Sequence, residues 1–391
     1  MRIVFVNHTA QWSGAEIALM RLVQTLARCH EVVVVCPQPG RLLDEVRARG
    51  LSWLALPETA ASLRQHPVRT PLGMLQLARA GLALESIVRR VRPDVIHANG
   101  LRAGLIAAPG ARWRRSPTLV QVHDQLPHNV MGSTIRRTVS ATADEVVGVS
   151  DKTASDFNFG LPVAKAHRIY ISIDHERFDP TIAASSTLRA ELSVGDAPLL
   201  AQVAQITPWK CQHTAIETLA RLREIEPSAQ LVLVGAVVFA SERYDNQAYE
   251  RELHDLARRL GVEGAVHFVG QREDVPEIMK TADLTLLPSA DEPFGTAAVE
   301  SMAMGTPTLV SDDGGMREFV EDGVSGCVLP THDPVVWART AADLLGDRHT
   351  LERMGAEGIR AARRFTDQQY AAQMEAAYER MRAARARRRA S

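Results

Sequence analysis

Short apolar runs alternate with longer segments of mixed polarity along both halves of the chain. Each run places apolar side chains at consecutive positions, as expected for a strand buried on both faces of a parallel sheet. The first half holds such runs at residues 2–7, 31–36, 94–97, 118–123, 145–149 and 168–173. The second half holds them at residues 199–204, 230–234, 266–270, 284–287 and 308–310. This alternation predicts an α/β protein with a doubly wound parallel sheet in each half, and ligands at the carboxyl ends of the strands.

Length and charge narrow the function classes. The 391 residues are enough for two domains, and the 46% hydrophobic content can give each domain a core. A net charge of −1 argues against a nucleic-acid binder. Residues 1–180 hold 22 Lys+Arg and 15 Asp+Glu, net +7, whereas the remainder hold 23 and 31, net −8. This asymmetry suggests that the first half faces something anionic.

Cysteine usage and hydropathy bear on the compartment. The four cysteines, at positions 29, 36, 211 and 327, show no disulfide or metal-ligand spacing, which suits a reducing environment. No apolar run approaches the about 20 residues that a membrane-spanning helix needs. Met1 leads directly into the first strand without a signal-peptide pattern. We therefore expect a cytoplasmic protein, which could still lie on a membrane surface.

The stretch from Pro288 to Pro307 combines a strand end, an acidic loop and a helix start. Gly295 opens the helix, where free backbone N–H groups attract anions and the missing side chain lets a phosphate approach closely. Glu292 lies on the loop and Glu300 on the second turn of the helix. Carboxylates accept hydrogen bonds from the vicinal hydroxyls of ribose and hexose rings. These residues predict a site for a phosphorylated sugar.

A dinucleotide site is the main alternative for a doubly wound sheet. The first turn, residues 7–14, contains one glycine and no G-x-G-x-x-G pattern. The second strand ends at Cys36, where an acidic residue would be needed to bind ribose. Both departures argue against a dehydrogenase of the Rossmann type.

The second-half motifs as a set resemble a known signature. Glu292-Pro-Phe-Gly295, Glu300, the following Met-Ala-Met-Gly-Thr-Pro and Gly314-Gly315 are similar to the donor-binding signature of retaining glycosyltransferases with the GT-B fold. The resemblance is closest to the large group 1 type, family four, which uses nucleotide-activated sugars. It implies two Rossmann-like domains facing a cleft, residues 1–178 and 179–365. It also implies a last helix, about 366–391, that crosses back to the first domain.

The resemblance assigns roles to matching residues. Glu300 would bind the ribose and Glu292 the donor sugar, and His123 would lie beside the reacting carbon. His123, Glu292 and Lys210 are the candidate catalytic residues. The predicted donor-binding residues are Gly14, Gln205, Lys210, Gly235, Arg272, Glu292, Phe294, Gly295, Thr296 and Glu300.

Gln205 departs from the family pattern, because an arginine is expected there beside Lys210. A leaving diphosphate gains negative charge, and two cations stabilise it more than one. Arg272 and Arg317 are candidates for the second cation. No Asp-x-Asp pair occurs, so we expect no metal and no cofactor, only a UDP- or GDP-linked sugar as substrate.

Strand ends in the first half supply the remaining candidates. His123 ends a strand beside Asp124, and the preceding strand end offers His97 and Asn99 as weaker candidates. A lone histidine at a strand end is often structural, but the resemblance favours a functional role for His123. Ser13-Gly-Ala-Glu16 resembles the family's Gly-Gly-Ala-Glu turn, and Ser13 can also cap the helix that follows.

The acceptor is expected in the first domain as a hydroxyl compound. Residues 62–92 and 112–115 are basic and apolar, which suits either a core helix with an arginine edge or weak contact with an anionic membrane. The arginine-rich tail, residues 382–391, is expected to fray. Two alternatives to a transferase stay open. One is a sugar-nucleotide epimerase, and the other is a non-catalytic nucleotide-sugar-binding protein, which Gln205 would suit.

Overall fold

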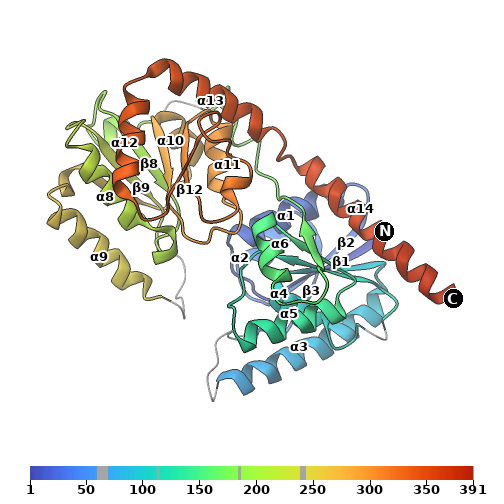
Figure 1. Cartoon of the computed structure of the whole chain (residues 1–391). Helices are drawn as coiled ribbons and strands as arrows, with labels where there is room; N and C mark the ends of the chain where they lie inside the picture. The colour runs from blue at the N-terminus through green and yellow to red at the C-terminus, as the bar shows by residue number, and fades with distance from the viewer. Residues whose placement is uncertain (60–68, 112–113, 184–185, 238–243, 391) are drawn as a thin grey trace. The chain divides into compact units, whose positions relative to one another are not determined.

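A computed structural model of the chain describes residues 1–390 apart from 60–68, 112–113, 184–185 and 238–243, with the backbone alone at 69–71 and 388–390. The chain forms two compact units. Unit 1 comprises residues 1–172 and 367–391, and unit 2 comprises residues 173–366. Each unit is built on one parallel sheet, so the predicted α/β architecture is confirmed (Figure 1).

Unit 1 contains a seven-stranded parallel sheet of order β3-β2-β1-β4-β5-β6-β7. Its strands are β1 (Arg2–Asn7), β2 (Glu31–Cys36), β3 (Ser52–Ala55), β4 (Val95–Asn99), β5 (Thr118–Val122), β6 (Glu145–Gly148) and β7 (Ala166–Arg168). Its helices are α1 (Gly14–Leu26), α2 (Arg41–Ala48), α3 (Arg69–Val91), α4 (Leu101–Ala107), α5 (Val130–Thr142), α6 (Asp151–Asn158) and α14 (Asp367–Ala390). Val4 and Val6 pack in the core with α3 and α4, whereas Phe5 contacts the His97 ring on the opposite face.

Unit 2 contains a six-stranded parallel sheet of order β10-β9-β8-β11-β12-β13. Its strands are β8 (Leu199–Val203), β9 (Gln230–Val234), β10 (Val266–Gly270), β11 (Leu284–Leu287), β12 (Thr308–Ser311) and β13 (Cys327–Leu329). Its α-helices are α7 (Leu188–Glu191), α8 (Gln212–Leu222), α9 (Asn246–Arg259), α10 (Val275–Thr281), α11 (Thr296–Ala303), α12 (Pro334–Leu345) and α13 (Arg348–Ala362). Short 3-10 turns are η1 (Pro208–Lys210), η2 (Glu263–Ala265) and η3 (Met316–Glu318). Separate apolar clusters lie on the two faces of the sheet, as a doubly wound topology requires.

Helix α14 returns to unit 1 and packs on α1, so the predicted crossing back is confirmed. The Tyr378 hydroxyl lies 2.7 Å from His97 Nδ1, and the Tyr370 hydroxyl donates to Gln121 Oε1 at 2.9 Å. His97 Nε2 donates to the same Gln121 oxygen at 3.1 Å. These side chains are all buried, and burial lowers the pKa of His97 to about 3, so its ring is neutral. The helix therefore completes a polar cluster inside the unit.

The predicted fraying of the tail is wrong for the residues that the structure describes. Helix α14 continues to Ala390, and Arg385 pairs with Asp144 at 3.0 Å. The Arg385 guanidinium also donates to the carbonyls of Ala111 and Arg114, at 3.0 and 2.5 Å. The three residues that Arg385 contacts lie more than 240 positions earlier in the sequence. A local sequence pattern cannot indicate such distant contacts.

The segment that leaves unit 1 also differs from expectation. Strand β7 ends at Arg168, whereas a strand was predicted over 168–173. Unit 2 begins at Ile173, ahead of the predicted boundary after residue 178. The Ile173 N–H donates to the Phe365 carbonyl at 3.0 Å, which ties the start of unit 2 to its end. The short edge strand β13 was not predicted, because its three residues are too few to show a pattern.

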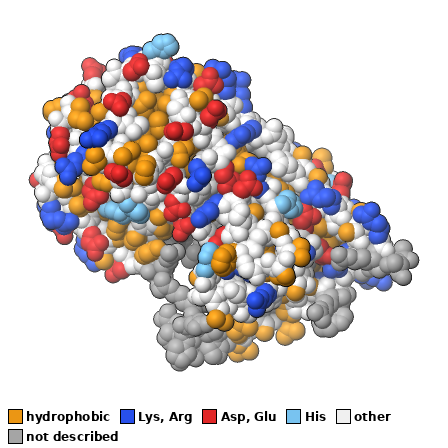
Figure 2. Space-filling view, viewed as in Figure 1, with side chains coloured by type: hydrophobic (Ala, Val, Ile, Leu, Met, Phe, Trp, Pro, Cys, Tyr) orange, Lys and Arg blue, Asp and Glu red, His pale blue; other side chains and the backbone are white. Residues whose placement is uncertain are grey.

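One face of the molecule shows how its charged side chains are distributed. On the face that Figure 2 shows, acidic and basic side chains are intermixed. Within the described ranges, no helix has both the length and the apolar composition needed to cross a membrane.

We predict that Tyr378→Phe destabilises unit 1 by about 1–3 kcal/mol, because it leaves the buried His97 Nδ1 without a hydrogen-bond donor. Tyr370→Phe should cost less, since Gln121 Oε1 still receives a hydrogen bond from His97. Urea denaturation of the full chain, followed by far-UV circular dichroism, compares the two variants. Equal stability of Tyr378→Phe and the wild type would show that the helix contact contributes nothing.

Candidate functional site

Three neighbouring strands of unit 2, β8, β11 and β12, bring their following loops together. The Ala290 N–H donates to the Trp209 carbonyl at 2.8 Å, which joins the first two loops. The Gly315 N–H donates to the Glu292 carbonyl at 2.8 Å, which joins the second and third. The predicted donor residues from three separate segments are therefore held in one place.

An ion pair occupies the junction of the first two loops. Lys210 Nζ lies 2.5 Å from Glu292 Oε2 and 4.0 Å from the centre of the Trp209 ring. The side chains are only 16% and 8% exposed. Charges withdrawn from water in this way need close partners. The pair couples the predicted diphosphate cation to the predicted sugar carboxylate, and each group could exchange its partner for a phosphate or a hydroxyl of a ligand.

The two predicted phosphate glycines differ in their surroundings. Gly14, at the start of α1, is exposed, and a Cβ there would have nothing within 4 Å. Gly295, before α11, has φ +93°, and a Cβ would lie 2.4 Å from Met316 Cγ. Gly295 is therefore required by its backbone conformation and by packing. Gly14, and not Gly295, has the open space beside its backbone that the close approach of a phosphate needs.

The other donor candidates lie on the same edge of unit 2. Gln205 follows β8, is half-buried, and its carbonyl accepts from Gln212 Nε2 at 2.9 Å. Gly235 follows β9, and its N–H donates to the Gly270 carbonyl at 2.8 Å. Thr296 is the first residue of α11, and Glu300 is half-buried on its second turn.

The Arg272 guanidinium already forms ion pairs with two carboxylates, which a phosphate would have to displace. Its guanidinium lies 2.8 Å from Asp274 Oδ1 and 2.9 Å from Glu191 Oε2. These hydrogen bonds raise the pKa of Arg272 and lower the pKa of both carboxyls. Arg317, the other candidate cation, donates to the Asp312 carbonyl at 3.3 Å.

The side chain of Phe294, another predicted donor residue, lies in the core of unit 2. Its side chain is 3% exposed, and its ring centre lies 5.2 Å from Phe319 and 5.7 Å from Phe365. These partners come from distant segments, so the sequence motif alone did not reveal the aromatic cluster. The ring belongs to the core of unit 2, which anchors the loop that carries Glu292.

In unit 1 a chain of polar side chains runs from His123 to the Gly14 turn. His123 Nε2 donates to Asn99 Oδ1 at 2.7 Å, and Asn99 Nδ2 donates to Asn7 Oδ1 at 2.8 Å. Asn7 Nδ2 donates to Glu16 Oε1 at 3.1 Å, and Glu16 Oε2 accepts from Ser13 Oγ at 2.5 Å. All five lie at the carboxyl edge of β1, β4 and β5, and we call them the His123–Ser13 chain. The sequence pointed to His123 and Ser13, the two ends of the His123–Ser13 chain. Asn99 was a weaker candidate, and its position at the end of a strand was the only sign of it.

The direction of these hydrogen bonds fixes the state of His123. An amide oxygen can only accept, so Nε2 carries the proton and Nδ1 is left as an acceptor. Burial lowers the pKa of His123 to about 4, which keeps the ring neutral at pH 7. Burial also raises the pKa of Glu16, against the hydrogen bonds from Ser13 and Asn7. Burial raises the pKa of Asp124, the residue after His123, and Arg102 opposes that rise.

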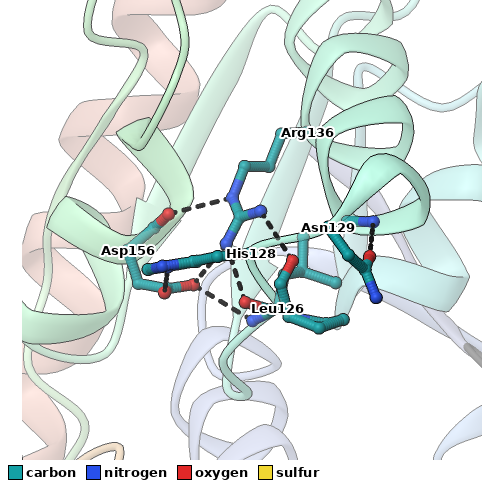
Figure 3. Close-up of polar contacts among 7 residues, drawn as sticks. Leu126, His128, Asn129, Arg136 and Asp156 are labelled. Atoms are coloured by element: carbon teal, nitrogen blue, oxygen red, sulfur yellow. Dashed lines mark hydrogen bonds and ion pairs between the residues drawn. The ribbon is translucent and has the colours of Figure 1, made fainter.

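A buried arginine fixes the loop that follows His123. The Arg136 guanidinium donates to the carbonyls of Leu126 and Pro127 at 2.8 and 3.1 Å (Figure 3). It also pairs with Asp156 Oδ2 at 3.1 Å, and that oxygen accepts from the Leu126 N–H at 3.0 Å. Sequence reasoning missed Arg136, since an arginine on an amphipathic helix usually faces solvent. Here it satisfies loop carbonyls that would otherwise be unpaired.

One group of possible metal ligands stands out among the described residues. Cys211 is buried, His213 is half-buried and His332 is exposed, and one ligand atom from each lies within 4.8 Å of the others. No cysteine shows metal-ligand spacing in the sequence, because His332 lies far along the chain from Cys211 and His213. Burial raises the pKa of the Cys211 thiol to about 11 and lowers the pKa of His213.

Comparison with protein families covers both halves of the chain. The family model described as glycosyl transferases group 1 matches residues 185–361. The model described as glycosyltransferase family 4 matches residues 12–177. Each match therefore falls almost entirely within one structural unit.

Solved structures share the fold across nearly the whole chain. HepE from Anabaena, crystallised in complex with UDP, is 25% identical with a TM-score of 0.83, over 97% of this chain and 100% of that one. Sucrose-phosphate synthase from Thermosynechococcus elongatus is 20% identical with a TM-score of 0.78, over 98% and 99% of the two chains.

Several relatives carry the name D-inositol 3-phosphate glycosyltransferase, and two of them show the range of coverage. The one from Catenulispora acidiphila is 33% identical over 230 residues, which cover 57% of this chain and 53% of the relative. The chain thus spans about half the length of this and other curated relatives that it matches. The one from Kribbella flavida is 30% identical over 317 residues, which cover 75% of this chain and 73% of the relative. With both halves matched and the fold shared, the chain belongs to the group 1 glycosyltransferases and has the GT-B fold.

Proposed function

We propose that this protein transfers a sugar from a nucleoside-diphosphate sugar to a hydroxyl acceptor, with retention of configuration and without a metal at the donor. The buried Lys210–Glu292 pair supports the proposal, because a cation and a carboxylate that could bind a phosphate and a sugar lie where three loops meet. HepE was crystallised with UDP and with UDP-glucose, which supports UDP as the nucleotide.

Unit 2 would bind the donor. Lys210 would neutralise the charge that develops on the leaving diphosphate, assisted by the free N–H groups at the start of α11. Glu292 would then accept hydrogen bonds from the sugar, and Glu300 from the ribose. The bond between the anomeric carbon and the phosphate oxygen breaks, and the acceptor oxygen bonds to the same face. The acceptor's proton passes to the departing phosphate, so the step needs no protein nucleophile.

Unit 1 would contribute to the same reaction through the His123–Ser13 chain. A neutral His123 with a free Nδ1 can accept a hydrogen bond from a sugar hydroxyl without adding positive charge at the reacting carbon. The chain connects this ring to the Gly14 turn, so both groups would be positioned together.

The acceptor is proposed to be anionic. Residues 1–180 carry a net charge of +7, and the relatives' name includes an inositol phosphate. Two classes of acceptor fit this charge, a small phosphorylated polyol and a lipid-linked anion. The exposed apolar and basic side chains of α3 favour the anionic lipid.

Helix α3 has two apolar faces. Leu77, Ala80 and Leu84 pack in the core. The other face exposes Leu72, Met74, Leu75 and Leu82, which are 53%, 62%, 67% and 74% accessible. Arg79, Arg89 and Arg90 are exposed on the same helix. Exposed apolar side chains beside arginines suit the surface of an anionic membrane. The sequence suggested membrane contact for residues 62–92 and 112–115. Residues 62–68 and 112–113 of these two stretches lie outside the described residues.

Two other activities would give distinct results. An epimerase would convert the donor without any acceptor. A nucleotide-sugar-binding protein without activity would bind the donor and neither transfer nor hydrolyse the sugar, and the glutamine at position 205 is the feature that suits it.

We predict that Lys210→Ala lowers the transfer rate by about 10²–10³-fold, as loss of one group stabilising the transition-state charge does. Lys280→Ala is the matched control, since Lys280 is exposed on α10 in the same unit and donates to the Ala183 carbonyl. Gln205→Arg should keep or raise activity by adding a second cation. Release of UDP from UDP-sugars, with and without D-inositol 3-phosphate as the first acceptor tested, measures all four proteins. Melting curves check that each variant is folded, because Glu292 is left unpaired in Lys210→Ala.

Transfer that is indifferent to Lys210→Ala would remove the phosphate site assigned here. If Gln205→Arg creates turnover that the wild type lacks, the wild type is a binding protein with a decayed site.

The His123–Ser13 chain predicts a change in pH dependence. His123 must be neutral to accept a hydrogen bond, so wild-type activity should fall only as the pH drops towards about 4. In Asn99→Asp, the added carboxylate stabilises the imidazolium and raises the pKa of His123, so this acidic limb should move to higher pH. Asn99→Ala should lower kcat more than it raises KM. Asn129→Ser, which retains a cap for α5, is the control. An unchanged pH profile in Asn99→Asp would show that the chain is purely structural.

The exposed face of α3 predicts weak, salt-sensitive binding to anionic vesicles. Leu75→Glu combined with Leu82→Glu should abolish it, whereas Ile225→Glu, at a 59% exposed site in unit 2, should not. Co-sedimentation with phosphatidylserine vesicles at low and high salt measures the effect. Failure of the wild type to bind at low salt would leave the small phosphorylated acceptor as the proposal.

A further inference from the structure

A cysteine and two histidines meet in unit 2 beside the Lys210 turn. Cys211 lies at the junction of η1 and α8, His213 in the first turn of α8, and His332 in the loop between β13 and α12. The His213 and His332 rings are nearly parallel, with centres 6.0 Å apart and planes inclined by 12°. We propose that Cys211, His213 and His332 bind a divalent cation of the zinc class.

The donor atoms select that class of cation. One thiolate and two imidazoles form a soft-to-borderline set that suits Zn²⁺ and disfavours Mg²⁺ or Ca²⁺, which require oxygen ligands. Three protein ligands leave the fourth tetrahedral position for water. This cation is separate from the metal-free donor site proposed for Lys210 and Glu292.

A buried tyrosine orients one ligand. The Tyr249 hydroxyl lies 2.8 Å from His213 Nδ1 and accepts from the His213 backbone N–H at 3.2 Å. Metal-binding histidines usually have such a partner on the ring nitrogen that does not face the metal. The contact leaves His213 Nε2 for the cation. His332 makes no hydrogen bond to any described residue, so its ring is free to turn towards the same point.

The backbone holds two of the ligands in an unusual conformation. Cys211 has φ +53° and His332 has φ +66°, in the left-handed region that favours glycine. Residues with a side chain rarely adopt this conformation, and those that do cluster at ligand sites. This backbone geometry at two of the three proposed ligands is consistent with a ligand site.

The cation would connect two segments of unit 2. Cys211 directly follows Lys210, whose carbonyl accepts from Gln202 Nε2 at 2.7 Å. A metal bound to Cys211 and His332 would tie the Lys210 turn to the loop that precedes α12. The proposal does not depend on glycosyl transfer, because it rests on metal ligands and not on the donor residues.

Metal binding to untagged full-length protein tests the proposal directly. Zn²⁺ should raise the melting temperature, and Co²⁺ should give a sulfur-to-cobalt charge-transfer band in the near ultraviolet. His332→Ala should weaken Zn²⁺ binding by about 100-fold or more, since loss of an outer partner alone costs about 10–100-fold. Tyr249→Phe should fall within that outer-partner range. His349→Ala, which removes an exposed histidine of α13, should bind like the wild type.

Cys211→Ser separates the thiolate from the imidazoles, because it should remove the charge-transfer band while weakening binding. His332 is exposed, so its loss leaves the core intact, and circular dichroism verifies the fold of every variant. Equal Zn²⁺ affinity of the wild type and His332→Ala would overturn the proposal, as would a cobalt band that persists in Cys211→Ser.

Discussion

Neighbouring parallel strands that end side by side create the His123–Ser13 chain in unit 1 and the Lys210–Glu292 site in unit 2. In unit 1 the adjacent strands β1, β4 and β5 bring together Asn7, Asn99 and His123. In unit 2 the adjacent strands β8, β11 and β12 bring together the loops of Lys210, Glu292 and Gly315. Residues distant in sequence become neighbours because the strand order places them there. The two units thus use one geometric rule to build different chemistry.

Much of this arrangement could be predicted from the sequence. Apolar runs marked most strands, since a strand buried on both faces needs apolar side chains at successive positions. The loop–helix motif around Glu292 marked the donor candidates, because a helix start after a strand end is a recurring anion site. Lys210 was found by resemblance alone, and the structure adds its ion pair with Glu292.

The rest depended on long-range packing that no local pattern records. Phe294 lies in a conspicuous motif, yet Phe319 and Phe365 make it a core residue. Arg136 looks like a surface arginine until the loop carbonyls of Leu126 and Pro127 are placed against it. Cys211 has no metal-ligand spacing, and only the fold brings His332 to it. In each case the residue that determines the role lies on another helix, strand or loop. Hydrophobic periodicity and motif spacing therefore could not predict the contact.

The return of α14 to unit 1 has a consequence for the order in which the protein is made. Arg21 of α1 pairs with Asp367 of α14 at 2.8 Å. Helix α1 therefore lacks this partner until 346 further residues have been synthesised. Unit 2 is one continuous segment, whereas residues 1–172 of unit 1 leave the ribosome before α14 can pack on α1. Nascent chains with exposed apolar surface are prone to aggregate. Unit 1 can therefore complete its packing only after residues 367–390 have been synthesised.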